Sequence, residues 1–391
     1  MNRRPDLFAP LRVLLVTETY PPEINGVAMT TGRMVAGLRA RGHWVGVVRP
    51  RRHGGEKDCD LEWGVTGISL PNYPEVKLGL PHWRRINQLI RTHKPDLVHV
   101  VTEGPLGWAA LLAARHLGLP VTSGYHTHFD QYSSHYGMAW LTPLVTRWLD
   151  ALHRRCQATL VPAPELAETL RARGIPNVQV VGRGVDTALF TPDRRDPALR
   201  QSWGLEADAD TPPACLFVGR LAPEKNLAAV VHSHAAIAAR HPGAPMVWVG
   251  DGPALAGLKA AHPDHFFAGP RIGEDLARHY ASADLFLFPS LSETWGNVIG
   301  EAMASGLGVV AYDRAAAATL IRDGENGRAP APGDEQAFIE AALSMAGDAE
   351  HRRALGLSAR ETTVEISWEQ ITSRLEAVLR EAQLAQIAAR S

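Results

Sequence analysis

The chain has 391 residues, of which 45% are hydrophobic and 21% charged, and it carries a formal net charge of −1 at pH 7. Its length exceeds the usual size of one hydrophobic core and its composition is that of an ordinary globular protein, so we expect two domains and little disorder. Three scattered cysteines exclude a disulfide framework and a zinc site, and the lack of a long apolar run or a signal-peptide core predicts a cytoplasmic protein.

The small net charge hides an asymmetry between the two halves of the chain. Residues 1–190 contain 22 Lys and Arg against 15 Asp and Glu, a balance of +7, whereas residues 191–391 contain 18 against 26, a balance of −8. Such a division is typical of halves with different partners, with the basic half facing an anionic one, although sequence drift also produces it. We expect no nucleic-acid partner.

Buried strands and helical stretches alternate along the first half of the chain. The predicted strands are residues 13–17, 44–48, 97–101, 121–125 and 158–162. The predicted helices are residues 26–38, 82–93, 105–117 and 139–155. Alternation of this kind indicates a parallel sheet with helices on both faces, the doubly wound α/β arrangement.

The same pattern restarts after a Pro- and Asp-rich segment at residues 191–213. The strands predicted there are residues 216–218, 246–249, 285–288 and 309–311. The chain closes with an amphipathic helix predicted at residues 368–388. We therefore predict an α/β protein with two doubly wound, Rossmann-like domains that join near residue 191.

The first strand leads into a loop in which Gly26 opens a helix. A glycine lets a phosphate approach the backbone closely, and helix N-termini bind anions, so Gly26 is a candidate ligand contact. The Gly-x-Gly-x-x-Gly pattern of dinucleotide folds is absent here. A glycine that merely opens a turn is the alternative interpretation.

His126 directly follows the predicted strand at residues 121–125. A histidine at a strand end is well placed to hydrogen-bond a substrate, although an isolated histidine is more often structural. The neighbouring polar groups favour the functional interpretation. His128 and His135 make a metal site conceivable, but no carboxylate at a matching spacing supports one.

Two cations follow the first strand of the second half, where Gly219 is succeeded by Arg220 and Lys225 before a helix. The planar fork of an arginine and the point charge of a lysine together suit a diphosphate. A solvated surface pair is the alternative. Gly250 and Gly252 close the next strand and are expected to shape the same pocket.

The strand at residues 285–288 leads into a loop with Glu293 and then into a helix with Glu301. In open α/β sheets, ligands bind outside the carboxyl ends of the strands. Because a carboxylate repels a phosphate, both acids are better suited to neutral hydroxyls, as on a sugar or a ribose. Together with the two cations, they suggest a nucleotide sugar.

These segments, in this order, resemble the retaining glycosyltransferases of family 4 across nearly the whole chain. The likeness is greatest in residues 20–27, 125–129, 183–192 and 293–298. It points to the branch that contains GDP-mannose-dependent α-mannosyltransferases and the sulfoquinovosyl and glycosyl diacylglycerol synthases. The resemblance implies the GT-B fold, in which two Rossmann-like domains face an interdomain cleft.

The resemblance also implies a function for each domain. Residues 1–190 would form an acceptor-binding domain, to which a C-terminal helix from about residue 368 to residue 391 would return. Residues 191–367 would form the domain that binds the nucleotide-sugar donor. The implied reaction is hexosyl transfer to a hydroxyl group with retention of the α configuration, without a metal or another cofactor.

Individual roles follow from the same resemblance. Arg220 and Lys225 would hold the diphosphate, while Glu301 would bind the ribose hydroxyls. Glu293 would bind the donor sugar, and His126 would contact that sugar from the other side. The catalytic set is therefore His126, Glu293, Arg220 and Lys225. The donor-binding set is Gly26, Arg220, Lys225, Glu293, Trp295, Gly296, Asn297 and Glu301.

The donor and the acceptor are predicted from the branch alone. GDP-mannose and a lipid-linked or glycolipid acceptor are expected, with a UDP-sugar-dependent diacylglycerol glycosyltransferase as the alternative. The sequence departs from the family at Trp295, Gly300 and Gly308, and we expect these changes to touch the wall of the donor pocket. A nucleotide-sugar epimerase and a non-catalytic nucleotide-sugar-binding protein are alternatives from other classes.

The predicted helix at residues 82–94 suggests contact with a membrane. Its apolar residues are expected on one face, and they are Trp83, Ile86, Leu89 and Ile90. Its cations spread over the other face, and they are Arg84, Arg85, Arg91 and Lys94. Such a helix can hold a protein peripherally on the cytoplasmic face of an anionic membrane. A helix packed on the sheet with a solvated basic face is the alternative.

Overall fold

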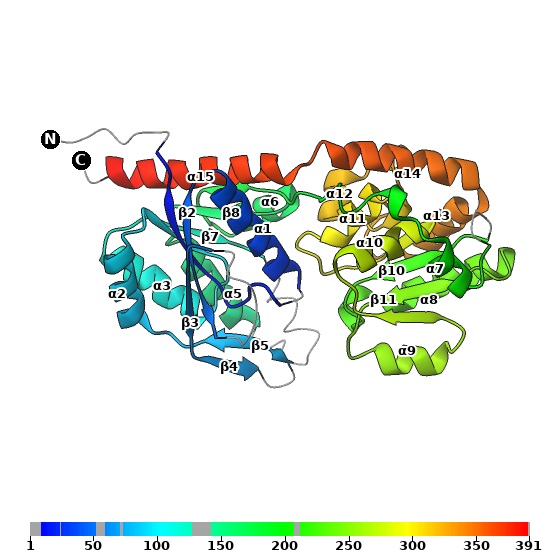
Figure 1. Cartoon of the computed structure of the whole chain (residues 1–391), viewed down its shortest axis with the longest axis horizontal. Helices are drawn as coiled ribbons and strands as arrows, with labels where there is room; N and C mark the ends of the chain where they lie inside the picture. The colour runs from blue at the N-terminus through cyan, green and yellow to red at the C-terminus, as the bar shows by residue number, and fades with distance from the viewer. Residues whose placement is uncertain are drawn as a thin grey trace. The chain divides into compact units, whose positions relative to one another are not determined.

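The computed structural model describes residues 9–23, 25–51, 59–70, 73–126, 142–206 and 212–389. The chain divides into two compact units, each with its own parallel sheet (Figure 1). Unit 1 comprises Met1–Arg183 together with Trp368–Ser391, and unit 2 comprises Gly184–Ser367. The boundary between the units therefore falls after residue 183, whereas the sequence predicts it after residue 190.

Unit 1 contains a seven-stranded parallel sheet in the order β3-β2-β1-β6-β7-β8-β9. Its strands are β1 (Arg12–Val16), β2 (Trp44–Pro50), β3 (Leu61–Val65), β6 (Leu97–Val100), β7 (Val121–Gly124), β8 (Ala158–Val161) and β9 (Val178–Val180). An antiparallel pair, β4 (Gly67–Leu70) and β5 (Tyr73–Gly79), departs from the predicted parallel alternation. The prediction of a doubly wound parallel sheet is confirmed, although β3, β4, β5 and β9 are additional to it.

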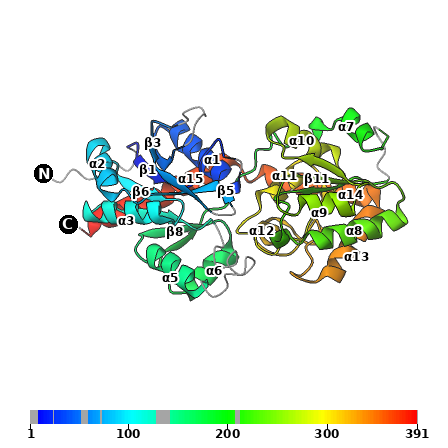
Figure 2. The same ribbon diagram turned by 90° about the horizontal axis from the view of Figure 1, so that it is seen from below.

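Alternate residues of β1 face opposite sides of this sheet, as the two-residue period of a strand requires. Val13 and Leu15 belong to one core, whereas Leu14 and Val16 belong to another. The helices of unit 1 are α1 (Gly26–Ala40), α2 (Trp83–His93), α3 (Pro105–His116), α5 (Thr142–His153), α6 (Pro164–Ala172) and α15 (Trp368–Ala388). Helices α1 and α15 cover the first core, and α2 and α3 cover the second (Figure 2).

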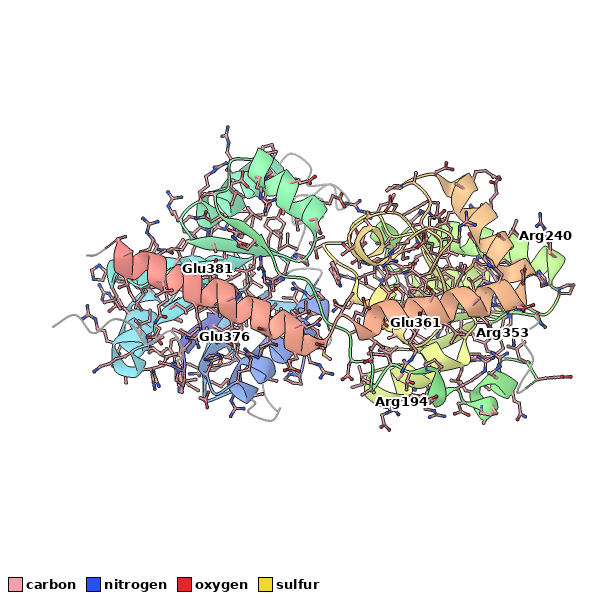
Figure 3. The ribbon with its side chains drawn as sticks, turned by 90° about the horizontal axis from the view of Figure 1, so that it is seen from above. Arg194, Arg240, Arg353, Glu361, Glu376 and Glu381 are labelled. Atoms are coloured by element: carbon pink, nitrogen blue, oxygen red, sulfur yellow. The ribbon has the colours of Figure 1, made fainter. Side chains whose placement is uncertain are left out.

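Helix α15 has the bounds that the sequence predicts, and it packs against α1 and the sheet of unit 1. Leu375, Val378 and Leu379 bury its apolar face in the core beneath α1. Glu376, labelled on the same helix in Figure 3, pairs with Arg41 at the end of α1. Apolar contact and an ion pair therefore both tie this helix to unit 1.

Unit 2 contains a five-stranded parallel sheet in the order β12-β11-β10-β13-β14. Its strands are β10 (Cys215–Val218), β11 (Met246–Val249), β12 (Phe266–Gly269), β13 (Leu285–Phe288) and β14 (Gly308–Ala311). The sequence predicts four of these five strands and misses β12, the partly buried strand at one edge. The chain runs from β10 to β11 on one side and from β13 to β14 on the other.

The first helix of unit 2 precedes these strands, and the other helices lie between and after them. The helices of this unit are α7 (Pro197–Ser202), α8 (Leu227–Arg240), α9 (Leu255–Ala261), α10 (Gly273–Ser282), α11 (Asn297–Ala304), α12 (Ala316–Leu320), α13 (Glu335–Gly347) and α14 (Ala349–Val364). The Pro- and Asp-rich segment also contributes structure, because the Asp196 side chain caps α7 and the buried Arg200 pairs with Asp284. Among the described residues, no helix combines the length and the apolar character needed to cross a bilayer.

Candidate active site

The sheet order of unit 2 identifies the place where a ligand is expected. Strands β10 and β13 are neighbours, but the chain leaves them toward opposite sides of the sheet. Ligands of open α/β sheets bind at such a switch point, outside the carboxyl ends of the strands. The loop after β10 carries Arg220 and Lys225, and the loop after β13 carries Glu293.

The structure brings two of the predicted site residues into direct contact. The Lys225 ammonium group forms an ion pair with Oε1 of Glu293, and the two side chains are only 14% and 16% exposed. Ser290 donates a hydrogen bond to the same oxygen at 3.1 Å. The Ser292 hydroxyl donates to the Glu224 carbonyl at 3.2 Å, which ties the two loops together. The cation and the carboxylate are therefore held at one point of the switch.

Arg220 lies in a loop whose shape depends on two glycines of the neighbouring loop. A Cβ atom at Gly250 would lie 1.9 Å from the Gly219 carbonyl oxygen, and one at Gly252 would lie 2.4 Å from the Leu221 carbonyl oxygen. Both glycines have positive φ angles, 140° and 157°. Only residues without a Cβ allow this approach of two backbones, so the two glycines determine the shape of the Arg220 loop.

Helix α11 begins at the site with free N–H groups. Its N-cap, Gly296, has φ +89°, and a Cβ there would lie 3.5 Å from the Glu293 side chain. The amide groups of Asn297 and Val298 have no earlier helical carbonyl to bond and can stabilise negative charge, whereas the Ile299 amide donates to the Gly296 carbonyl at 3.1 Å. The Trp295 side chain is buried, and its carbonyl accepts a hydrogen bond from Ala316 at 2.9 Å, so this residue also holds the loop against α12.

Glu301 lies one turn further along α11 and is hydrogen-bonded to a residue that sequence reasoning missed. The hydroxyl of Tyr280, which is fully buried, donates to Glu301 Oε2 at 3.0 Å. Burial raises the pKa of Glu301 to about 7, and the tyrosine hydrogen bond only partly opposes this effect. Burial and the neighbouring carboxylate raise the pKa of Tyr280 well above its usual range. Nothing in the sequence around Tyr280 signals this contact.

Gly300 and Gly308, two of the positions at which the sequence departs from the family, lie in different parts of unit 2. Gly300 is in α11, where a Cβ atom would lie 2.7 Å from Val185. Gly308 starts β14, at the amino end of the sheet, where a Cβ atom would lie 2.7 Å from Arg352 and from Met345. The expectation that Gly308 touches the donor pocket is therefore wrong, because the switch point is at the opposite end of the strands.

In unit 1, Gly26 is the first residue of α1, after an N-cap formed by Asn25. His126 follows β7 and is buried, with Nδ1 2.5 Å from a guanidinium nitrogen of Arg183. A Cβ atom at Gly124 would lie 2.2 Å from His126 Nε2, so the imidazole edge rests on that glycine. Burial and the Arg183 charge lower the pKa of His126 well below its usual range. The residue is thus a neutral, enclosed imidazole.

Glu18 is a second functional candidate that the sequence did not reveal. It follows β1, and its carboxylate accepts hydrogen bonds from the backbone of Gly79 and, at 3.3 Å, of Leu106 in the first turn of α3. Burial raises its pKa to about 7. A Cβ atom at Gly104 would lie 2.3 Å from the carboxylate, so glycine is needed beside it. The Glu18 carboxylate therefore occupies the N-terminus of α3, at the switch point between β1 and β6 of unit 1.

Two other features do not belong to the site. Among the described residues, no group of three or more His, Cys, Asp or Glu side chains could hold a metal ion, and His128 and His135 lie outside those residues.

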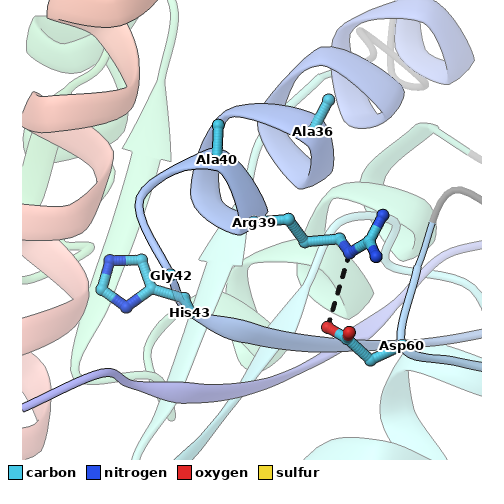
Figure 4. A pocket seen from close by; sticks show the side chains of 6 residues that line it. All are labelled: Ala36, Arg39, Ala40, Gly42, His43 and Asp60. Atoms are coloured by element: carbon cyan, nitrogen blue, oxygen red, sulfur yellow. Dashed lines mark ion pairs between the residues drawn. The ribbon is translucent and has the colours of Figure 1, made fainter.

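An open pocket beside the end of α1 contains the ion pair between Arg39 and Asp60 (Figure 4). It borders Gly42, just before β2, and so lies at the amino ends of the strands.

The chain matches two sequence profiles of known families. Residues 24–189 match "Glycosyltransferase Family 4", and residues 212–348 match "Glycosyl transferases group 1". The GDP-mannose-dependent alpha-mannosyltransferase of Mycobacterium tuberculosis is 35% identical over 372 residues, which cover 93% of this chain and 95% of that protein. Sulfoquinovosyl transferase SQD2 of Arabidopsis thaliana is 30% identical over 379 residues, covering 94% of this chain and 73% of that protein.

Solved structures of similar fold have lower sequence identity. The sucrose-phosphate synthase of Thermosynechococcus elongatus has a TM-score of 0.79 at 20% identity, covering 95% of this chain and 99% of that one. HepE from Anabaena in complex with UDP has a TM-score of 0.74 at 20% identity, covering 95% of this chain and 100% of that one. These similarities show the fold alone.

Proposed function

The chain belongs to glycosyltransferase family 4, and on that premise we propose that it transfers a mannosyl group from GDP-mannose to a hydroxyl of a lipid-linked or glycolipid acceptor, with retention of the α configuration. That it is a glycosyltransferase using a nucleotide sugar follows from its family and its relatives. The fold is the GT-B fold, as the sequence predicts. The donor, the acceptor and the residue roles below are proposals.

The choice of GDP-mannose is supported by three relatives that match nearly the whole chain. Three proteins named GDP-mannose-dependent alpha-mannosyltransferase are 32% to 35% identical to this chain over more than nine-tenths of its length. The alpha-monoglucosyldiacylglycerol synthase of Streptococcus pneumoniae is 26% identical over 80% of the chain. A UDP-sugar donor is therefore the second choice.

The ion pair of Lys225 with Glu293 is the observation that carries the assignment of the donor site. A lysine at this point can neutralise a phosphate oxygen, and a carboxylate can accept hydrogen bonds from sugar hydroxyls. Their contact places the phosphate-binding group and the hydroxyl-binding group side by side, as binding of a glycosyl phosphate requires. We assign the diphosphate to Lys225 and Arg220, and the sugar hydroxyls to Glu293.

The remaining groups complete a site for the nucleotide sugar. Glu301 would accept hydrogen bonds from the ribose hydroxyls when it is ionised, with Tyr280 supporting its carboxylate. Breaking the glycosyl–phosphate bond places negative charge on the leaving oxygens, which the two cations and the α11 amides would stabilise. No carboxylate at the site is assigned as a nucleophile, so we propose that the acceptor hydroxyl attacks from the face of the departing phosphate.

A lipid acceptor is supported by relatives and by one surface. The names of the relatives include diacylglycerol synthases and a phosphatidylinositol monomannoside mannosyltransferase. On α2, the predicted apolar face is largely buried, because Ile86 and Ile90 pack in the core beneath the helix. Trp83 is 43% exposed, and the cations of the helix are exposed with it. We propose that this basic surface meets anionic lipid, where each cation contributes roughly 1 kcal/mol.

The test is a transfer assay with a panel of donors. The full-length protein is incubated with GDP-mannose, UDP-glucose or UDP-galactose and a bacterial lipid extract, and new glycolipids are identified by mass spectrometry. We expect a mannolipid from GDP-mannose only. Transfer from a UDP-sugar alone would overturn the donor but keep the enzyme class, whereas a changed sugar nucleotide without transfer would indicate an epimerase.

A further inference from the structure

Arg183 is a buried cation at the end of unit 1 to which the proposed reaction gives no role. It follows β9, and only 5% of the residue is exposed. Its Nη1 donates to the carbonyls of Val181 and Gly182 at 3.3 and 3.2 Å, and its Nη2 donates to His126 Nδ1 at 2.5 Å. Because a guanidinium only donates, Nδ1 is the acceptor and the neutral imidazole carries its proton on Nε2. None of these three partners is negatively charged.

Two other buried arginines among the described residues are paired with a carboxylate, whereas the buried Arg352 donates to the carbonyls of Met345 and Ala346. Arg200 pairs with Asp284 at 3.0 Å, and Arg49 pairs with Glu62 at 2.8 Å. Within the described part of the chain, no carboxylate forms an ion pair with Arg183. Burial lowers its pKa to about 9, so the group is still cationic at neutral pH. An uncompensated buried charge lowers stability, and such a cost is commonly retained where the charge has a function.

The position of Arg183 suits a ligand. It lies beyond the carboxyl ends of β7 and β9, the edge of the sheet where ligands bind. Its Nε–H donates to no acceptor among the described residues and is not sealed from solvent. The first half of the chain also carries an excess of positive charge, 22 Lys and Arg against 15 Asp and Glu in residues 1–190.

We propose that Arg183 binds an oxyanion, a phosphate or a carboxylate, on the acceptor substrate. The three neutral partners fix the guanidinium without cancelling its charge, so its field is available to an incoming anion. The assignment to the acceptor rests on the proposed function, in which unit 1 binds that substrate. The presence of an oxyanion site on Arg183 does not rest on it and is tested separately.

The first test measures binding of inorganic phosphate without any donor. Because Arg220 and Lys225 would bind phosphate as well, both are changed to Gln in the background protein. We expect phosphate to raise the Tm of this protein by on the order of 1–2 °C over sodium chloride of equal ionic strength. Arg183→Gln should abolish this rise. The matched control is Arg171→Gln, which removes an exposed arginine that bonds the β9 carbonyl of Val178 at 2.8 Å.

A rise that persists in the Arg183→Gln protein, or that the Arg171→Gln control also loses, would overturn the oxyanion site whatever the enzyme transfers. Stability gives an independent readout without ligand. Removing an uncompensated charge should leave the Tm of Arg183→Met at or above that of the wild type. A fall in Tm with an unchanged phosphate response would instead assign Arg183 a purely structural role.

The second test distinguishes the source of the oxyanion. Steady-state transfer is measured with a phosphate-bearing, a carboxylate-bearing and a neutral glycerolipid of the same acyl chains. Arg183→Gln should raise the KM of one of the two anionic acceptors at least about tenfold while changing the KM of the neutral lipid and of the donor little. Arg183→Lys, which keeps the charge, should restore part of the loss. An equal change for all three lipids, or a change in the donor KM alone, would contradict the assignment to the acceptor.

Discussion

The protonation of Glu301 should control donor binding near neutral pH. Burial raises the pKa of this carboxyl group to about 7, and only its ionised form accepts hydrogen bonds on both oxygens from ribose hydroxyls. About one-tenth of the group is ionised one unit below this pKa and about nine-tenths one unit above it. The association constant of the donor should therefore rise about tenfold between roughly pH 6 and pH 8, which corresponds to about 1.4 kcal/mol.

Isothermal titration with GDP-mannose is the suitable assay. Free GDP has a terminal phosphate whose own second ionisation falls near pH 6, whereas both phosphates of the sugar nucleotide are esterified and do not titrate there. Glu301→Gln should bind more weakly at pH 8 and lose the pH dependence. Tyr280→Phe removes a hydrogen bond that lowers the pKa of Glu301, so the midpoint of the binding profile should move to higher pH.

The Glu301→Gln control is needed because the Glu18 carboxyl group also has a pKa of about 7. If Glu18 were the group responsible, the pH dependence would persist in Glu301→Gln and disappear in Glu18→Gln. Donor affinity that is constant from pH 6 to pH 8 in the wild type would refute the assignment of Glu301 to the ribose.

Three further predictions concern the donor site, the need for a metal and the basic surface of α2. Lys225→Ala should lower kcat/KM by an amount equivalent to about 2–4 kcal/mol. Glu293→Ala should mainly lower kcat, while its affinity for GDP stays close to that of the wild type. An equal loss of GDP affinity in the two variants would contradict the division of roles. Transfer activity should survive EDTA, and complete loss that Mg²⁺ or Mn²⁺ restores would reject a metal-free diphosphate site. The wild type should co-sediment with anionic vesicles at low salt more than a variant with Arg84→Glu, Arg85→Glu and Arg91→Glu, whereas equal sedimentation would favour a soluble acceptor.

Much of the architecture could be predicted because its determinants are local. Strands such as β11 and β13 are short apolar runs between helical stretches, and the sequence predicts both with the observed bounds. Helix α15 likewise shows its apolar face in the spacing of its residues. The edge strand β12 and the pair β4–β5 escape prediction because partial exposure and non-local pairing leave no clear pattern.

The site residues on loops could be named from the sequence, but their partners could not. Lys225 and Glu293 are 68 residues apart, and only the adjacency of β10 and β13 brings them into contact. Tyr280 lies at the end of α10, and nothing nearby indicates that it supports Glu301. Arg183 and Glu18 are also set by long-range packing, since each acts on a residue or backbone group from a different strand or helix.

The central claim, a retaining transfer from a nucleotide sugar, is tested most directly by the stereochemistry of the product. The protein is incubated with GDP-α-mannose and its glycolipid acceptor, and the anomeric configuration of the purified product is read from its one-bond carbon–hydrogen coupling by NMR. We predict an α-mannoside, formed by the wild type and far more slowly by Lys225→Ala at matched enzyme concentration. A β-mannoside would contradict the proposed front-face attack.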